Sequence, residues 1–230
     1  MYHMDDNMEI VPRIHNLGGK SVNYYLVEDD GEIILIDTGL PGNSSKIVDY
    51  VEKTLKRKPQ DIKTIVITHS HFDHVGSLSK IKEITGAQVA IHPADADYVR
   101  GKTKHIGGTF INALIKLFQI VYRTKPVEPE IMLKDCDVMS GYQVIHTPGH
   151  SPRSICLYNP EKKVIFVGDI LQYKNGRLQS PGKKLIPEPE KYGESLRKLL
   201  DLDIKIILTG HTAPVTSGGG ELLREFVKTF

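Results

Sequence analysis

The segment from position 68 to position 74 holds four potential metal ligands within six positions: His69, His71, Asp73 and His74. In an extended backbone, side chains at alternate positions share one face, so His69, His71 and Asp73 can point together. His74 must then turn aside, which suits a ligand of a second ion. Such a cluster has little value to an apolar core, and the spacing therefore predicts a metal site.

Three further candidates stand later in the chain, each in a turn directly after a glycine: His150, Asp169 and His211. Glycine lets the backbone turn tightly and come close to a site. With the first cluster they make five histidines and two aspartates, a set that suits borderline-hard divalent ions such as zinc. The other five histidines lack such surroundings and are expected to have core or surface roles: His3, His15, His92, His105 and His146.

The elements that must position these residues follow an alternating pattern. Strands are predicted at 9–14, 22–27, 33–36, 65–67, 89–91, 142–146, 155–158, 164–167 and 204–208. Helices are predicted from 44 to about 58 with Ser44 as the cap, from about 76 onward, at 190–200 and from 221. A strand, a helical crossover and a further strand favour a layered α/β architecture.

These motifs together resemble the metallo-β-lactamase superfamily. The match runs from Asp37 to His211, with all five of the family's motif positions present in order. The resemblance implies an α/β fold, the αββα four-layer sandwich, formed by one domain over residues 1–230. Asp37, in Asp-Thr-Gly at the end of a predicted strand, matches the first motif. It is expected to support the ligands from behind and not to bind metal itself.

The resemblance also implies how the ligands divide between two metal ions. The first ion is assigned to His69, His71 and His150, the second to Asp73, His74 and His211, with Asp169 bridging the two. Two divalent ions about 3.5–4 Å apart lower the pKa of a shared water from about 15.7 toward 7. Asp73 and Asp169 are the catalytic candidates, and Asp73 could also move a proton, as analogous residues are proposed to do. Zinc is the expected metal, with iron and manganese as alternatives.

The family has several branches that the fold and the ligands do not separate. His71 stands where flavo-diiron relatives carry glutamate, and about 19 residues after His211 leave no room for glyoxalase II's helical domain. We therefore expect hydrolysis of a thioester, lactone or related ester-like bond in a small molecule. Three alternatives stay open: a persulfide dioxygenase-like enzyme with one iron, a phosphodiesterase or nuclease of the same superfamily, and a non-catalytic metal-binding protein.

The composition of the chain limits the classes of binding partner that we expect. Thirty basic and 28 acidic residues leave a net charge of +2, without the basic excess expected of a nucleic-acid-binding protein. No apolar run approaches the roughly 18 residues that cross a bilayer, and the polar start is not a secretory signal. We expect a cytoplasmic protein with two free thiols, at least half-buried, and no membrane partner; a homo-oligomer is compatible with the sequence.

Two segments are expected to shape the pocket. Within an insertion at 101–126, the apolar run 110–123 is a candidate lid whose Phe110 and Phe118 would face substrate; a packing helix or a dimer surface is the alternative. The second segment, 172–184, contains Tyr173 and the cations Arg177, Lys183 and Lys184. A tyrosine or cation there could bind a substrate carboxylate or the oxyanion, and a solvated loop is the alternative.

Overall fold

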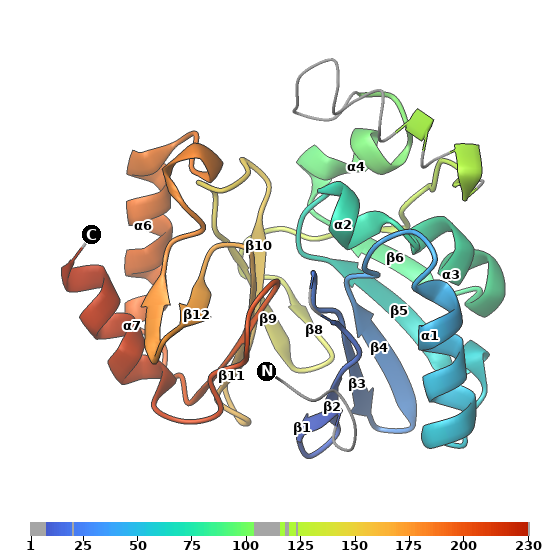
Figure 1. Ribbon diagram of the computed structural model, residues 1–230, viewed down its shortest axis with the longest axis horizontal. Coiled ribbons are helices and arrows are strands. Elements are labelled where there is room, and N and C mark those ends of the chain that lie inside the picture. The colour runs from blue at the N-terminus through green and yellow to red at the C-terminus, as the bar shows by residue number, and fades with distance from the viewer. Residues whose placement is uncertain (1–7, 20, 104–115, 118–119, 123, 230) are drawn as a thin grey trace. The chain divides into compact units, whose positions relative to one another are not determined.

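The computed structural model describes residues 8–19, 21–103, 116–117, 120–122 and 124–229. The chain divides into two compact units, Met1–Met132 (unit 1) and Leu133–Phe230 (unit 2). Unit 1 combines one sheet with helices, and unit 2 combines a larger and a two-stranded sheet with helices (Figure 1). The single domain over residues 1–230 stays a prediction.

Unit 1 contains a seven-stranded sheet in the order β1 to β7. Its strands are β1 (Glu9–Val11), β2 (Ile14–Asn16), β3 (Tyr25–Asp29), β4 (Glu32–Ile36), β5 (Ile62–Ile67), β6 (Gln88–Ile91) and β7 (Ile131–Met132). The first four strands pair antiparallel, whereas β4 to β7 are parallel to one another. Parallel neighbours need crossover connections, so the carboxyl ends of β4, β5 and β6 lie at one edge of the sheet.

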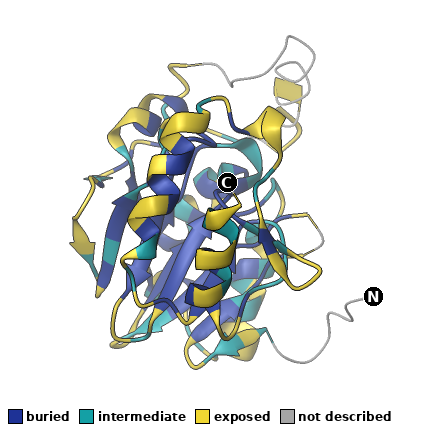
Figure 2. Ribbon diagram, turned by 90° about the vertical axis from the view of Figure 1, so that its left-hand side faces the viewer, coloured by how far each residue is buried: buried dark blue, intermediate teal, exposed yellow. Residues whose placement is uncertain are grey.

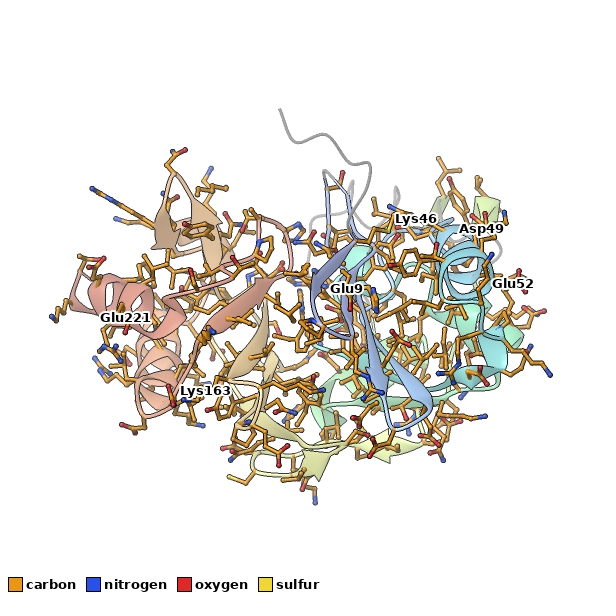
Figure 3. All side chains as sticks on the ribbon, turned by 90° about the horizontal axis from the view of Figure 1, so that it is seen from below. Glu9, Lys46, Asp49, Glu52, Lys163 and Glu221 are labelled. Atoms are coloured by element: carbon orange, nitrogen blue, oxygen red, sulfur yellow. The ribbon has the colours of Figure 1, made fainter. Side chains whose placement is uncertain are left out.

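Helices form the crossovers of unit 1. They are α1 (Ser44–Asp49), continued by a π-helical turn (Tyr50–Thr54), α2 (Phe72–Val75), α3 (Leu78–Thr85) and, after β6, α4 (Pro93–Val99). Ile47, Val51 and Ile81 are fully buried in one core with the strand residues, while Asp49 and Glu52 lie on the outer side (Figure 3). Each such buried aliphatic side chain contributes about 1.5–3 kcal/mol.

Unit 2 contains a five-stranded sheet in the order β14-β11-β10-β9-β8. Its strands are β8 (Val138–Met139), β9 (Tyr142–His146), β10 (Ile155–Asn159), β11 (Val164–Gly168) and β14 (Ile206–Thr209). Only the β11–β14 pair of this sheet is parallel, so the carboxyl ends of these two strands lie side by side.

Two helices, α6 (Pro189–Leu200) and α7 (Gly219–Lys228), cover the sheet of unit 2. Tyr192, Leu196 and Leu199 of α6 are fully buried in one core with residues of β10, β11 and β14. Figure 2 shows the exposed residues on the outward faces of the helices and buried residues on the strands behind them.

The segment 172–184 contains an element that we did not predict. Strands β12 (Gln172–Lys174) and β13 (Arg177–Gln179) form an antiparallel hairpin, and a 3-10 turn follows at Lys183–Leu185. Asn175 and Gly176 in the turn have φ angles of 53° and 77°. Two positive φ angles are the signature of a type I′ turn, whose twist matches that of the strands.

Most other predicted elements are present with shifted ends. The predicted strand at 9–14 is two strands, because Arg13 turns the chain at a positive φ of 68°. The helix from Ser44 ends its α-helical part at Asp49, and Asn43 holds the cap position in place of Ser44. Strands β7 and β8 and helix α4 were also not predicted.

Both cysteines are free as expected, but Cys136 is exposed and only Cys156 is buried. No helix in the part of the chain that the structure describes is both long and apolar enough to cross a membrane.

Candidate metal centre

Three histidine rings gather in the loop and helix that follow β5 in unit 1. His69 Nε2 lies 3.0 Å from His71 Nδ1, and the rings of His69 and His74 have centroids 4.1 Å apart. His69 and His74 are buried, and His71 is half-buried. Asp73, which directly precedes His74 in α2, has a carboxylate oxygen within 4.8 Å of a His74 ring nitrogen. All four sequence-predicted ligands of unit 1 thus lie within one short segment, the ligand loop, residues 68–74.

Asp37 holds the ligand loop from the end of β4. Its carboxylate accepts hydrogen bonds from the backbone N and Oγ1 of Thr68, and His74 Nδ1 lies 2.8 Å from Oδ2. Thr68 Oγ1 in turn lies 3.1 Å from His69 Nδ1. A proton on each Nδ1 completes these bonds and leaves the Nε2 lone pairs of His69 and His74 available to a metal ion. Asp37 itself is 3% exposed and has a positive φ of 58°.

A second buried carboxylate, Asp95, contacts the ligand loop from the other neighbouring strand. It lies in the first turn of α4, directly after β6, and is 1% exposed. Ser70, between two of the ligands, donates to it from its backbone N at 3.1 Å and from Oγ at 2.5 Å. We did not single out Asp95 from the sequence. The signal that could have found it is the helix start at His92-Pro93, since proline is favoured at the first helical position.

In unit 2, the three predicted ligands come together around Asp169. Asp169 follows β11, and its Oδ2 lies 3.0 Å from His211 Nε2 and 3.5 Å from His150 Nε2. His211 follows β14, the parallel neighbour of β11, which explains why two residues 42 positions apart are in contact. His150 Nδ1 lies 2.8 Å from the backbone oxygen of Leu185, so its Nε2 is again the nitrogen available to metal.

Gly149 explains why the turn before His150 fits against α6. Its φ is 139°, and a Cβ at this position would lie 2.5 Å from the Cα of Tyr192. Ser195 Oγ also donates to the oxygen of Pro148 at 2.7 Å. Only glycine lets the backbone approach the helix this closely.

The donor spacings within each unit fit a divalent metal ion. Two ligand atoms about 2.0–2.1 Å from a tetrahedral ion are roughly 3.3–3.4 Å from each other. The His69–His71, His150–Asp169 and His211–Asp169 donor pairs, at 3.0, 3.5 and 3.0 Å, bracket that spacing. Imidazole and carboxylate donors with buried hydrogen-bonded supports are what zinc or iron would require.

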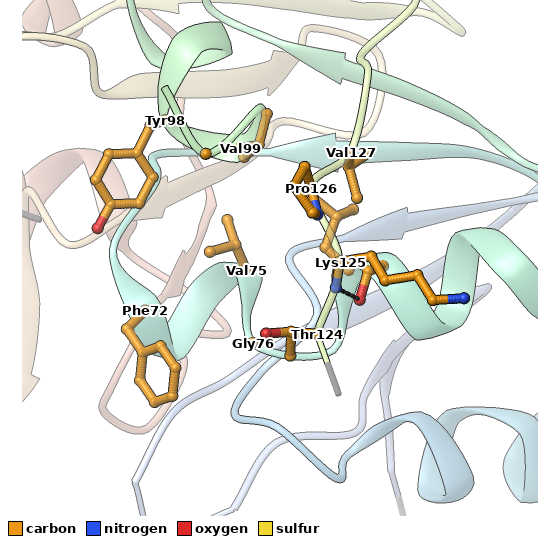
Figure 4. A pocket seen from close by; sticks show the side chains of 12 residues that line it. Phe72, Val75, Gly76, Tyr98, Val99, Thr124, Lys125, Pro126 and Val127 are labelled. Atoms are coloured by element: carbon orange, nitrogen blue, oxygen red, sulfur yellow. Dashed lines mark hydrogen bonds between the residues drawn. The ribbon is translucent and has the colours of Figure 1, made fainter. Parts of the chain in front are cut away.

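A pocket of about 280 Å³ lies in unit 1 beside α2. Phe72 and Val75 of α2, Tyr98 and Val99 of α4, and the segment 124–127 line it (Figure 4). Lys125 in that segment donates from its backbone N to Ser79 Oγ, which ties the segment to α3. Phe72 immediately precedes the predicted ligand Asp73, so the pocket borders the ligand loop.

The remaining predicted residues have mixed outcomes. Tyr173 is half-buried and packs against the core of unit 2, and its backbone N donates at 2.8 Å to the hydroxyl oxygen of Thr212, the residue after His211. Phe110 and Phe118, with most of the candidate lid, lie outside the described residues.

Of the five histidines expected to have core or surface roles, the structure describes three. His15 contacts Glu28 and Tyr50, His92 accepts from the backbone N of Ala94 at the start of α4, and His146 contacts the oxygen of Pro152. His3 and His105 lie outside the described residues.

Comparison with known proteins identifies the family. The metallo-β-lactamase superfamily model matches residues 17–211. A probable metallo-hydrolase, YflN of Bacillus subtilis (strain 168), is 27% identical over 230 residues, covering 90% of this chain and 87% of that protein. Hydroxyacylglutathione hydrolase GloC of Haemophilus influenzae is 29% identical, with 92% and 93% covered. The acyl-coenzyme A thioesterase MBLAC2 of Homo sapiens is 28% identical, with 66% of this chain and 59% of that protein covered.

Solved structures show the same fold. The metallo-β-lactamase family protein TTHA1429 of Thermus thermophilus has a TM-score of 0.70 and 25% identity, covering 94% of this chain and 78% of its own. TTHA1623, solved in a di-iron-bound form, has a TM-score of 0.64 and 27% identity, with 90% and 96% covered. This chain therefore belongs to the metallo-β-lactamase superfamily, has its fold and is a metal-dependent hydrolase.

Proposed function

We propose that the ligands of both units together hold two divalent ions and that the enzyme hydrolyses a thioester of a small molecule. The donor spacing within each unit carries the metal part of this proposal. The thioester part is supported by two relatives whose names specify S-acyl substrates, MBLAC2 for coenzyme A and GloC for glutathione. Lactones and phosphodiesters are the alternatives within the same family.

The assignment of ligands follows the family pattern. His69, His71 and His150 would hold the first ion, and Asp73, His74 and His211 the second, with Asp169 between them. When bound, the ions would supply a water of lowered pKa and positive charge beside the carbonyl oxygen. Zinc suits the imidazole-rich set, and the di-iron form of TTHA1623 makes iron the first alternative.

The chain's own residues would position the ligand loop and transfer protons. Asp37 and Asp95 keep the ligand loop in one conformation, so that little reorganisation is needed during reaction. Asp73 is half-buried, in contrast to the buried His74. Its carboxylate oxygen is the atom that we assign to accept the proton of the attacking water and to deliver it to the departing thiolate sulfur.

The direct test combines metal analysis with a substrate panel. We expect about two metal ions per chain and turnover of thioesters in preference to lactones and phosphodiesters. Asp169→Ala should lose at least one ion and nearly all hydrolysis, because it removes the carboxylate that contacts both His150 and His211. Asp201→Ala, an exposed aspartate of the same unit, is the matched control.

Three outcomes would count against the proposal. Two retained ions and intact turnover in Asp169→Ala would refute the bridging role. Turnover of lactones alone would refute the substrate class. One iron per chain with oxygen consumption and no hydrolysis would favour the dioxygenase alternative.

A further inference from the structure

Unit 2 carries a concentration of positive charge between Asp169 and Glu188. The segment 170–187 contains four basic residues and no acidic one: Lys174, Arg177, Lys183 and Lys184. All four are exposed. Within the described part of the chain, none of them has an ion pair. These four residues form the cationic rim.

Several basic side chains elsewhere in the structure pair with acids. Four examples are Arg57 with Asp61, Arg100 with Glu128, Lys163 with Asp203, and Lys198 with Asp135. The four cations of this segment differ in being gathered within eighteen positions that contain no acidic residue.

The register of the hairpin brings two of these four cations next to each other. Lys174 and Arg177 are directly opposite each other across β12 and β13. Like charges in that position are destabilising. The other face of the hairpin explains its position, because Leu178 is buried and Tyr173 packs against the core of unit 2. The hairpin is thus anchored through one face and presents two repelling cations on the other.

Two backbone contacts tie the cationic rim to the metal ligands. The oxygen of Leu185, the residue after Lys184, contacts His150 Nδ1. The backbone N of Tyr173, the residue before Lys174, donates to Thr212 Oγ1, next to His211. Consecutive Cα atoms are about 3.8 Å apart, so Lys184 and Lys174 each begin within about 4 Å of a residue that touches a ligand-bearing turn. Their long side chains extend outward from there.

We propose that the cationic rim binds the phosphate groups of the substrate, which identifies the substrate class as a coenzyme A thioester. This inference rests on the proposed thioester hydrolysis. A coenzyme A thioester has its phosphates at the far end of the pantetheine arm from the reacting carbonyl, which requires cations around the metal centre and not in it. A glutathione thioester has carboxylates and no phosphate, and a simple lactone has neither. Arg177 can hold a phosphate through two parallel N–H donors, and lysines act as point charges.

The experiment compares three thioesters that share one acyl chain, on coenzyme A, on pantetheine without phosphate, and on glutathione. Two charge-reversal pairs are made, Lys174→Glu with Arg177→Glu, and Lys183→Glu with Lys184→Glu. Lys134→Glu with Lys205→Glu is the matched control, since both are exposed lysines of unit 2 outside the rim. Each reversal changes the local charge by four, and we expect KM for acyl-coenzyme A to rise about tenfold or more. KM for acyl-pantetheine and kcat for both should stay unchanged.

A binding measurement separates this inference from the proposed function. Equilibrium dialysis with free coenzyme A should show binding to the wild-type protein that weakens at higher salt and is reduced about tenfold or more in both rim variants. If coenzyme A binds in this way but no thioester is hydrolysed, the proposed function fails and the phosphate site stands. Three outcomes would overturn the phosphate site. They are equal KM changes for acyl-coenzyme A and acyl-pantetheine, a KM change confined to acyl-glutathione, and coenzyme A binding that is unchanged in both rim variants.

Discussion

Asp37→Asn is the change that tests most directly how the ligand loop is held. The wild-type carboxylate accepts three contacts, from Thr68 N, Thr68 Oγ1 and His74 Nδ1. Asparagine has nearly the same shape but only one acceptor oxygen. With that oxygen facing Thr68 N, its amide NH2 faces Thr68 Oγ1 and His74 Nδ1. The threonine hydroxyl can rotate and accept, but the protonated His74 Nδ1 cannot.

The cost follows from what His74 must then do. Leaving Nδ1–H without an acceptor in a buried site costs about 1–3 kcal/mol. Moving the proton to Nε2 instead removes the lone pair that we assign to the metal. Loss of such a supporting partner typically lowers metal affinity about 10–100-fold, equivalent to roughly 1.4–2.7 kcal/mol. The backbone should not suffer, because asparagine tolerates the positive φ of 58° at this position.

The assay is metal retention under graded chelator competition, with metal content measured at each step. We expect one of the two proposed ion equivalents to leave the Asp37→Asn protein at a chelator concentration about 10–100-fold lower than in the wild type. Asp30→Asn is the matched control, since Asp30 also has a positive φ, 39°, but is exposed. Wild-type retention of both ions by Asp37→Asn would refute the account of how His74 is oriented.

Two further predictions concern Asp95 and the cysteines. Asp95→Ala removes the acceptor of two Ser70 donors, so it should lower the free energy of unfolding by about 1–3 kcal/mol and metal affinity by about tenfold. Asp97→Ala, which changes an exposed residue of the same helix, is the control. Equal denaturation midpoints and equal chelator curves for the two variants would contradict this role of Asp95. Burial raises the pKa of Cys156 to about 12, so at pH 8 its thiol should stay protonated and inaccessible. A thiol reagent should therefore label the exposed Cys136 alone until the protein is unfolded; two labels per folded chain, counted by mass, would show that unit 2 opens readily.

The ligand loop could be predicted because its information is local. Four ligand-type side chains within six positions, directly after an apolar β-branched strand, need no knowledge of distant contacts. The three later ligands could be proposed only jointly with that cluster, since a glycine followed by histidine or aspartate is common in ordinary turns. The contact between Asp169 and His211 depends on the parallel pairing of β11 with β14, which places two strand ends side by side.

Asp95 and the hairpin were missed for different reasons. Helix α4 has only seven residues, too few for a clear apolar period, and the role of Asp95 depends on β5 and β6 being neighbours in the sheet. The hairpin did have a local signal. Asn175-Gly176 is the strongest short-range indication of a two-residue turn, but the flanking strands have three residues each and little alternation. Register, and with it the opposition of Lys174 and Arg177, comes only from the structure.

Asp37 and Asp95 together hold the ligand loop, which contains two buried histidines. They follow β4 and β6, the two parallel neighbours of β5, so the ligand loop is contacted by one buried carboxylate from each side. Asp37 fixes Thr68 and His74, and Asp95 fixes Ser70 between them. Because both act on one short segment, their effects should not be independent, and groups coupled through a shared backbone shift show interaction energies of about 0.5–3 kcal/mol.

A double-variant cycle measures that coupling. Asp37→Asn already lowers the conformational order of the ligand loop, so Asp95→Ala can lower it less in that variant than in the wild type. The double variant should therefore lose less metal affinity than the sum of the two single losses. Chelator competition on the wild type, both single variants and the double variant gives the four values. Strict additivity would mean that each carboxylate orients only its own partners, and that the ligand loop does not respond as one unit.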